Sequence, residues 1–403
     1  MIEGHPTDGL QALFGATEEE RESRGTRYTP QEILRQPATW RKTYEICAGL
    51  RPEQSEFLQK SGIGAEEKER VRPTVLLVGA GTSDYIGRSL MYLMRRLWKC
   101  EVWAVPSTDL LTNLDEFVLP ERPYVWVSFS RSGDSSEGLA VLEAAIEKYP
   151  RVRHVLVTCN KDGHMAAACR KASDRTLVLA LDETANDRGL AMTSSYSNMV
   201  IAGHCLAHVF SPAEYENTFA SLQQAGERFL ENARKAAMEI AAKDFSRACF
   251  VGSGVLRAVA QESALKLLEL TAGKIEAMSE STLGLRHGPL SALDENTLFV
   301  GFLSSDPRRR NYELDLLEEI HKKGLGKLRV AVTPGAGDAV GRKADRVLSL
   351  EAANLSDDYR APLDVMLAQW LGLFCSLRLG LKPDCPSPND AISRVVSHVK
   401  IYA

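Results

Sequence analysis

The sequence predicts an α/β protein with two tandem, doubly wound parallel sheets and a helical N-terminal extension. Three observations indicate this class. Apolar runs typical of buried strands alternate with helical patterns, the runs recur at a fixed spacing, and 403 residues exceed the size of one simple core. We therefore divide the chain into an extension (1–55), a first domain (56–213), a helical linker (214–245) and a second domain (246–403).

Each expected strand is a short run rich in Val, Leu, Ile or aromatic residues. In the first half, the Gly-rich turn Gly79–Ser83 follows the first strand and opens a helix that ends near Trp98. The second half repeats this order, and corresponding strands lie roughly 173 residues apart, which indicates an internal duplication. The expected strands are 74–78, 102–105, 124–128, 155–158 and 176–179, then 248–251, 297–300, 328–331 and 346–349.

Composition and charge exclude several classes of protein. Apolar content of 44% and charged content of 25% are typical of a soluble globular chain. The net charge of −4 lacks the excess of positive charge that is typical of nucleic-acid-binding proteins. No apolar run reaches the length of a membrane span, and Met1–Thr29 is polar without the apolar core of a signal peptide. The eight cysteines are scattered without a CxxC pair or a His/Cys cluster, which favours a cytoplasmic protein without a zinc site.

The segment from Val125 to Gly138 is an apolar run that ends in hydroxyls and a glycine before a helical pattern begins. Such a loop presents backbone N–H groups, hydroxyl donors and the positive end of a helix dipole, which together bind anions, most often phosphate. Five serines in nine positions exceed the needs of an N-cap and a turn, which is the alternative role. The loop lacks the lysine of the nucleotide-binding P-loop.

The segment from Glu262 to Glu269 places two carboxylates and an amine along one strip of one helix. Glu262, Lys266 and Glu269 are spaced i, i+4 and i+7, so their side chains lie within about 40° of one another. Leu265 and Leu268 point elsewhere and are expected to hold the helix in a core. The alternative is an amphipathic helix with ordinary ion pairs.

A histidine, His287, follows on the next loop within Leu285–Pro289. A buried acid beside a lysine, with a histidine nearby, is suited to moving protons. The second half carries Gly301–Arg308 where the first half has the serine loop, and a proline and basic residues interrupt it. One phosphate loop and one catalytic helix, from different halves, suggest one active site per chain, at the carboxyl ends of the strands.

The Gly-rich turns do not predict a dinucleotide site. The glycines at 79, 81 and 87 miss the GxGxxG spacing, and no acid suited to a ribose hydroxyl ends the following strand. We therefore do not expect NAD.

Taken in order, the motifs GAGTS, SFSRSGDSSE, ESALKLLELTAGK and GLRHGPLSAL resemble those of two-domain sugar isomerase (SIS) proteins. They are similar to the isomerase half of glucosamine-6-phosphate synthase. The resemblance is closer to the tagatose-6-phosphate ketose/aldose isomerase group, whose members are described as galactosamine-6-phosphate deaminase/isomerases. It runs from about Thr29 to the C-terminus and includes VPSTDLLTN at 105–113, DRGLAMTSS at 187–195 and SPNDAISRVV at 387–396.

The resemblance implies a role for each matching residue. Glu269 would move the proton between C1 and C2, Lys266 would stabilise the developing negative charge, and His287 would open the pyranose ring. Arg394 stands where the synthase group has a lysine. The loop from Asp187 to Ser194 lies where the family contacts the sugar, and we call it the sugar loop. Within it, the alternatives to a substrate role are a solvated Arg188 and an N-cap formed by 193–195. The implied catalytic residues are Glu262, Lys266, Glu269 and His287, and the implied substrate-binding residues are Thr82, Ser83, Ser130, Arg131, Ser132, Ser135, Asp187, Arg188, Thr193, Ser194 and Arg394.

The implied chemistry needs one base, an open sugar chain and a donor for the oxygen that becomes negative, without a metal or redox cofactor. For a 2-amino sugar the same base gives an enolamine and then a ketimine, and water releases ammonia. We expect conversion of galactosamine 6-phosphate to tagatose 6-phosphate and ammonia. A plain ketose/aldose isomerase and a sugar-phosphate-sensing binding protein are the alternatives. An amidotransferase is excluded because residue 2 is Ile2 instead of cysteine and the extension is too short for a glutaminase.

We also expect a homodimer or higher homo-oligomer, with neither nucleic acid nor membrane as a partner. In resembling proteins the loop before HGP crosses a subunit boundary. Here the stretch from Gly273 to Gly288 contains Gly284 and small polar residues, which allows it to extend outward. His287 is therefore expected to reach the active site of the partner chain, and a position on its own chain is the alternative.

Overall fold

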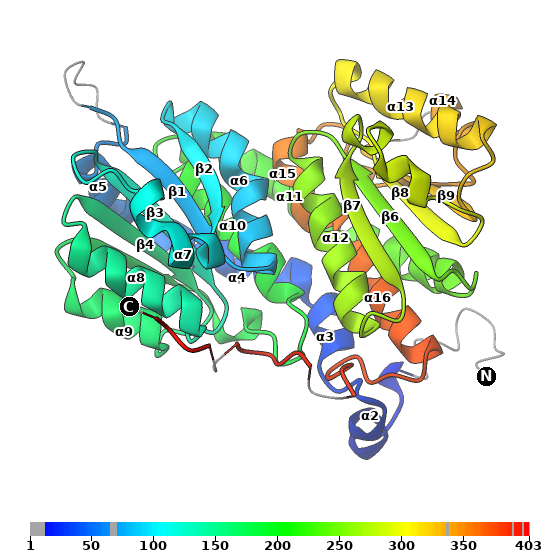
Figure 1. Ribbon diagram of the computed structural model, residues 1–403, viewed down its shortest axis with the longest axis horizontal. Coiled ribbons are helices and arrows are strands. Elements are labelled where there is room, and N and C mark those ends of the chain that lie inside the picture. Colours follow the sequence, from blue (N-terminus) through cyan, green and yellow to red (C-terminus); the bar gives the residue numbers. More distant parts are fainter. Residues whose placement is uncertain (1–12, 65–70, 336–337, 389–390, 397–398, 403) are drawn as a thin grey trace. The chain divides into compact units, whose positions relative to one another are not determined.

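Two parallel five-stranded sheets organise the chain in the computed structural model, which describes residues 13–64, 71–335, 338–388, 391–396 and 399–402 (Figure 1). Residues 1–12 of the expected extension and Asn389-Asp390 of the C-terminal motif lie outside this description. Each sheet belongs to one compact unit, and the four-part division along the sequence stays a prediction. The first-sheet unit comprises Ala38–Asn186, Ser194–Phe219 and Val395–Ala403, and the second-sheet unit comprises Met1–Pro37, Asp187–Thr193 and Ala220–Arg394.

The first sheet has the strand order β2-β1-β3-β4-β5, and every neighbouring pair is parallel. Because consecutive residues of a strand face opposite sides, fully apolar runs can bury both faces of such a sheet. The strands are β1 (Thr74–Gly79), β2 (Val102–Pro106), β3 (Tyr124–Ser130), β4 (Val152–Thr158) and β5 (Thr176–Ala180). The helices that follow them are α6 (Thr82–Trp98), α7 (Ser107–Phe117), α8 (Ser136–Lys148), α9 (His164–Lys171), η1 (Glu183–Ala185) and α10 (Ser194–Ala207).

Helices cover both faces of this sheet. Leu76 and Trp126 face one side, where they pack in a core with residues of α7 and α8. Leu77 faces the other side, where α6 comes so close that a Cβ on Gly87 would lie 2.9 Å from the Leu77 Cβ. Helix α10 packs on α6 over this second face, and the Trp98 indole donates a hydrogen bond to the Ala207 carbonyl. The strands therefore read as continuous apolar runs, as predicted.

The second sheet has the order β10-β9-β8-β6-β7 and is also parallel throughout. When β6 is matched to β1 and β8 to β3, this is the strand order of the first sheet, so the predicted duplication is confirmed at the level of topology. The strands are β6 (Arg247–Gly252), β7 (Glu276–Ser281), β8 (Thr297–Phe302), β9 (Leu328–Thr333) and β10 (Arg346–Ser349). The helices are α12 (Leu256–Leu270), η2 (Gly284–Arg286), η3 (Pro289–Ala292), α13 (Pro307–Lys322), α14 (Asp338–Gly341), α15 (Asp357–Asp364) and α16 (Met366–Arg378).

The sequence did not predict β7, the counterpart of β2. Its residues read Glu-Ala-Met-Ser-Glu-Ser, without the apolar run that marks the other strands, and four of its five last residues are polar or small. β7 is an edge strand that pairs only with β6 among the strands of its sheet. An edge strand tolerates polar residues because part of it faces solvent.

The predicted helical extension is present in the part of the chain that the structure describes. Its first described helix begins with a capping box, in which the Thr17 hydroxyl accepts the Glu20 N–H and the Glu20 carboxylate accepts the Thr17 N–H. Among the helices of the described residues, none is long and apolar enough to span a membrane. The remaining helices are α2 (Glu18–Arg24), α3 (Thr29–Leu34), α4 (Gln36–Gly49), α5 (Arg51–Lys60) and α11 (Pro212–Ala241).

Candidate active site

The loops after β1 and β3 lie side by side at the carboxyl edge of the first sheet. β1 pairs with both β2 and β3, so the chain leaves β1 toward one side and β3 toward the other. In doubly wound sheets, ligands bind at this point of reversal. The loop after β1 carries Thr82 and Ser83 into the first turn of α6, and both side chains are buried. A Cβ on Gly79 would lie 2.4 Å from the Ser83 carbonyl carbon, so only glycine permits this close turn.

The serine loop continues directly from β3. The Ser130 hydroxyl accepts the Gly133 N–H at 3.1 Å, and the Ser132 hydroxyl accepts the Asp134 N–H at 3.2 Å. The Ser130 and Ser132 hydroxyls thus stabilise the turn, which is the alternative role given above. Each hydroxyl still has its own O–H, which it can donate to a bound anion. Ser135 is the N-cap residue of α8, but its side chain makes no capping hydrogen bond. Its hydroxyl is therefore not needed to begin the helix.

Two neighbours of these serines carry charge. Arg131 is buried, although arginine rarely is. The Asp134 carboxylate accepts the His164 N–H at 2.9 Å at the start of α9, and the His164 ring nitrogen Nδ1 lies 2.8 Å from it. The negative charge of Asp134 is thereby compensated by α9 and does not oppose an anion at the serines.

The equivalent loop of the second sheet is filled by the protein's own carboxylates. After β8, the Ser304 N–H donates to the Glu313 carboxylate at 2.6 Å. The Ser305 N–H and hydroxyl donate to Asp357 at 2.8 and 2.9 Å, and the Ser304 hydroxyl also donates to Asp357. The buried Arg360 binds Asp357 and the Leu303 carbonyl. The donors that would bind an external anion are therefore occupied. This gives a physical reason why the second half does not repeat the phosphate-binding serine loop of the first half.

The strip on α12 forms one connected ion cluster. The Lys266 Nζ lies 3.3 Å from Glu262 Oε1 and 2.6 Å from Glu269 Oε2. The side chains of Lys266 and Glu262 are fully buried, and that of Glu269 is 23% exposed. Burial alone would lower the pKa of Lys266, but the two carboxylates outweigh it and raise the pKa above its usual range. Lys266 is therefore an ammonium held between two acids, of which Glu269 faces outward.

The leucines on this helix were predicted wrongly. Leu268 is 40% exposed and Leu265 is only half-buried, whereas Glu262 and Lys266 are fully buried. The helix buries its charged strip because α16 lies close against it: a Cβ on Gly372 would lie 3.0 Å from the Lys266 carbonyl oxygen. Tertiary packing has overridden the amphipathic pattern. An ordinary solvent-facing ion-pair strip is thereby excluded.

His287 forms no hydrogen bond or ion pair with the α12 cluster. It is exposed at the end of η2, and its backbone N–H donates to the Gly284 carbonyl at 2.9 Å. Its ring forms no hydrogen bond or ion pair with the residues that the structure describes. An imidazole without such contacts is free to act on a group outside its own unit.

The loop Asp187–Thr193 is fixed by hydrogen bonds to polar side chains from remote segments, the half-buried Arg394 and the buried Glu32. The Arg394 guanidinium donates to the Asp187 carbonyl through Nε at 2.8 Å and Nη2 at 2.5 Å. The Asp187 carboxylate accepts the Thr193 N–H at 2.8 Å and the Thr193 hydroxyl at 3.3 Å. Glu32 of α3 accepts the N–H groups of Arg188 and Gly189. The structure thus brings together Asp187, Thr193 and Arg394, which the sequence had grouped.

Glu32 is a residue that the sequence analysis missed. Burial first, and the nearby Asp187 second, raise the pKa of Glu32 to about 8. Asp384 adds a second missed carboxylate, because it accepts the N–H groups of Arg27, Tyr28 and Thr29 at 2.7 to 3.0 Å. In the sequence, an acid in the first turn of α3 resembles an ordinary helix-terminal residue, so no local signal identified it.

The other two residues of the predicted sugar loop have different surroundings. The Arg188 side chain is exposed, with its guanidinium 5.9 Å from the Tyr28 ring centroid. Ser194 is fully buried, where its hydroxyl lies 3.3 Å from the Thr39 hydroxyl and accepts the Asn198 side-chain amide at 3.1 Å. Arg188 is accessible to a ligand, whereas Ser194 belongs to an interior polar network. Among the described residues, no cluster of His, Cys, Asp and Glu could hold a metal ion.

Comparison with known proteins supplies the remaining findings. A model of the SIS domain matches residues 242–372. D-galactosamine-6-phosphate deaminase of Escherichia coli O157:H7 is 35% identical over 377 residues, which cover 93% of this chain and 95% of that protein. The deaminase of the same description from Shewanella sp. strain ANA-3 is 32% identical over 391 residues, covering 94% and 92%. The crystal structure of tagatose-6-phosphate ketose/aldose isomerase from Escherichia coli matches with a TM-score of 0.83 at 32% identity, covering 93% and 96%.

Proposed function

Because the chain belongs to the SIS domain family, within the tagatose-6-phosphate ketose/aldose isomerase group, we propose that it is an amino sugar phosphate deaminase/isomerase. The substrate is galactosamine 6-phosphate, and the products are tagatose 6-phosphate and ammonia. The observation that carries this proposal is the buried cluster of Glu262, Lys266 and Glu269, in a chain that is similar to the deaminases over nearly its whole length.

Glu269 is the proposed base. It is the only member of the cluster with an exposed fraction, 23%, so it alone can meet a substrate without unfolding of the helix. Its carboxylate takes the proton from C2 of the open-chain sugar and returns it to C1. A contribution of about 10²–10⁴ to the rate is usual for a positioned base.

Lys266 and Glu262 have supporting roles. The raised pKa keeps Lys266 charged at neutral pH, so the ammonium can orient Glu269 and stabilise negative charge that develops on the substrate. Glu262 holds the other side of the ammonium at 3.3 Å. A single lysine between two acids therefore keeps the base fixed while its charge changes during the reaction.

The reaction balances with water as the only co-reactant. After ring opening, removal of the C2 proton gives an enolamine, and protonation at C1 gives a ketimine at C2. Water adds to the carbon–nitrogen double bond, and the nitrogen leaves as ammonia while the carbon becomes the ketone of tagatose 6-phosphate. His287 is proposed to move the proton between O1 and the ring oxygen during ring opening.

Phosphate binding is assigned to the first-sheet unit. Ser130 ends β3, Ser132 lies in the loop that follows, and Ser135 is the N-cap of α8. Thr82 and Ser83 lie at the start of α6. Helices α6 and α8 follow the adjacent strands β1 and β3, so their two N-termini provide backbone N–H donors and two positive dipole ends. The occupied counterpart loop in the second sheet supports one phosphate site per chain.

We further propose a cytoplasmic homodimer in which His287 acts in the active site of the partner subunit. An exposed histidine without ionic contacts on its own described residues supports this arrangement. Leu268 within α12 and Leu283 directly before η2 are exposed apolar groups that a second subunit could cover.

A plain ketose/aldose isomerase is the second candidate, favoured by the name of the matching crystal structure. Both enzymes need the same base and ammonium, and they differ in whether C2 carries nitrogen or oxygen. A sugar-phosphate-sensing protein would have no need for a buried acid–amine–acid cluster.

The test is to incubate the purified protein with galactosamine 6-phosphate and with glucosamine 6-phosphate, while ammonia and ketose phosphate are measured in the same samples. We expect both products in equal amounts from the galacto substrate. A matched Glu269→Gln preparation should release neither. If galactose 6-phosphate and tagatose 6-phosphate interconvert while no amino sugar releases ammonia, the plain isomerase is correct.

A further inference from the structure

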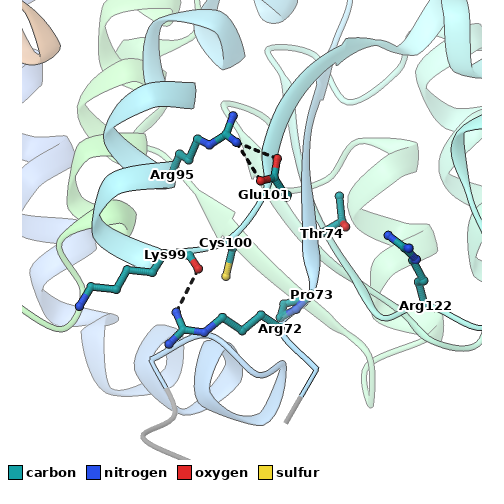
Figure 2. A pocket seen from close by; sticks show the side chains of 8 residues that line it. All are labelled: Arg72, Pro73, Thr74, Arg95, Lys99, Cys100, Glu101 and Arg122. Carbon is teal, nitrogen blue, oxygen red and sulfur yellow. Dashed lines mark hydrogen bonds and ion pairs between the residues drawn. The ribbon is translucent and has the colours of Figure 1, made fainter. Parts of the chain in front are cut away.

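A cavity of about 460 Å³ lies at the amino-terminal edge of the first sheet (Figure 2). Arg72 and Thr74 come from the start of β1, Glu101 precedes β2, Arg122 precedes β3, and Arg95 lies in the last turn of α6. The serine loop follows the carboxyl end of β3 in the same sheet. The cavity is therefore at the opposite end of the strands from the proposed phosphate loop, and it is a separate site.

The lining of this cavity is unbalanced in charge. Four basic residues, Arg72, Arg95, Lys99 and Arg122, accompany one acid, Glu101. Glu101 accepts two hydrogen bonds from Arg95, at 2.8 and 3.0 Å, so this pair is neutral, as the dashed lines in Figure 2 show. The other three cations form no ion pair with residues that the structure describes. They gather in a concave surface although the whole chain carries a net charge of −4.

Of these three cations, Arg72 has a structural role in the described part of the chain, and Lys99 and Arg122 have none. The Arg72 guanidinium donates to the carbonyl oxygens of Trp98 and Lys99, both at 3.1 Å, and so caps the negative end of α6. The Arg122 side chain extends toward Thr74 in Figure 2 and forms no hydrogen bond with the described residues. Arg122 and Lys99 thus add positive charge that no ion pair within the described ranges compensates.

We propose that this cavity binds a small anion that carries two phosphoryl groups. One phosphoryl group carries about 1.5 to 2 negative charges at neutral pH, so two phosphoryl groups match Lys99, Arg122 and Arg72, which keeps its full charge while it caps α6. Guanidinium groups suit phosphoryl oxygens because they donate two parallel hydrogen bonds. The volume is within the range of about 300–1,000 Å³ that small-molecule sites occupy. The buried Pro73 and Cys100 give the cavity an apolar part.

Trp103 provides a reporter beside the cavity. The Arg95 guanidinium lies 5.8 Å from the Trp103 ring centroid, and Trp103 is 51% exposed. The other four tryptophans of the chain are buried, so acrylamide in solution quenches mainly Trp103. They are Trp40, Trp98, Trp126 and Trp370. A nucleoside diphosphate could also stack its base on the exposed indole, whereas inorganic pyrophosphate could not.

The experiment compares two double charge reversals by titration calorimetry with inorganic pyrophosphate. Arg95→Glu/Arg122→Glu changes two lining residues. The control, Arg96→Glu/Arg151→Glu, changes the next arginine of α6 and the exposed arginine that precedes β4, so it has the same net charge at the same edge of the sheet. All measurements use full-length protein that also carries alanine at the two serine-loop positions 130 and 132, because that change is expected to weaken binding at the proposed phosphate loop.

We expect pyrophosphate to bind the protein with an intact cavity, and to bind more weakly as sodium chloride is raised. A nucleotide that stacks on the indole should in addition protect Trp103 from acrylamide. The lining reversal should weaken binding at least about tenfold, whereas the control should stay within about twofold. Tighter binding of ADP than of pyrophosphate would identify a nucleotide, and equal binding would identify the diphosphate alone; both support the site. Equal affinities of the two reversed proteins, or no binding once the serine loop is changed, would overturn it.

Discussion

The buried ammonium on α12 allows a sharp prediction for stability. Lys266→Met keeps the length of the side chain but removes the charge between Glu262 and Glu269. Breaking a buried ion pair by removal of one partner costs about 3–5 kcal/mol, because the other charge remains buried. Glu262 is fully buried and carries this cost, whereas Glu269 is partly exposed and adds little because water screens it.

The dependence on pH follows from the same cluster. In the native protein the raised pKa of Lys266 contributes stability that is complete below about pH 10 and is lost only as pH rises through the higher folded value. Lys266 therefore adds no pH dependence near neutrality. In Lys266→Met, the buried Glu262 loses its cationic partner, and burial favours the neutral, protonated carboxyl, so the destabilisation should be smaller at acid pH than at neutral pH.

The measurement is urea unfolding at both pH values, followed by amide exchange in peptides of α12 and α16, which report on the second-sheet unit. Glu262→Gln/Lys266→Met should recover part of the lost stability because no charge remains buried without its partner. The control Lys322→Met removes an exposed lysine with a similar ion pair on α13 and should cost less than about 1 kcal/mol. If Lys266→Met resembles this control at both pH values, the reasoning is refuted.

Four further predictions concern catalysis and binding. Glu269→Gln should lower turnover by at least about 100-fold while calorimetry still detects binding of the sugar phosphate; near-normal turnover would remove the assignment. Alanine at both Ser130 and Ser132 should raise KM for the phosphorylated sugar with little change in melting temperature, and unchanged affinity for inorganic phosphate would contradict it. With a pKa of about 8, Glu32 keeps its proton in the folded protein, whereas the unfolded chain loses it above about pH 4.5. The free energy of unfolding should therefore fall as the pH rises from about 4.5 to about 8, and Glu32→Gln should remove that fall. His287→Ala and Glu269→Gln should each be inactive alone, and a mixture of the two should regain activity after subunit exchange. Hetero-dimers that are shown by tag pull-down to form but stay inactive would contradict action of His287 in the partner subunit.

Much of the fold could be predicted because its strands are buried on both faces. Val125 and Trp126, for example, are both buried although they face opposite sides, so the strand appears in the sequence as one apolar run. β7 escaped prediction because an edge strand with polar residues lacks that signal. The spacing of Glu262, Lys266 and Glu269 correctly predicted one cluster, since helix geometry alone brings i, i+4 and i+7 together.

What could not be predicted depends on contacts between remote segments. Leu268 is exposed instead of buried, because α16 packs against α12 at Gly372 and the sequence of α12 contains no signal of that neighbour. Glu32 bonds to Arg188 across 156 positions of sequence, a relation that no local pattern records. The assignment of individual hydroxyls in the serine loop likewise needed the structure, because Ser130 and Ser135 are the same residue type with different neighbours.

The three-way fixation of the loop Asp187–Thr193 has a consequence for the order in which the chain can fold during synthesis. Glu32 is made before the loop, but Asp384 and Arg394, which hold α3 and the Asp187 carbonyl, are made after all the strands of both sheets. The strands β1 to β5 can pair while the ribosome is still translating the second sheet. The loop itself cannot reach its final conformation until Arg394 has left the exit tunnel. A nascent chain would thus acquire its first sheet early and the final conformation of the loop Asp187–Thr193 later.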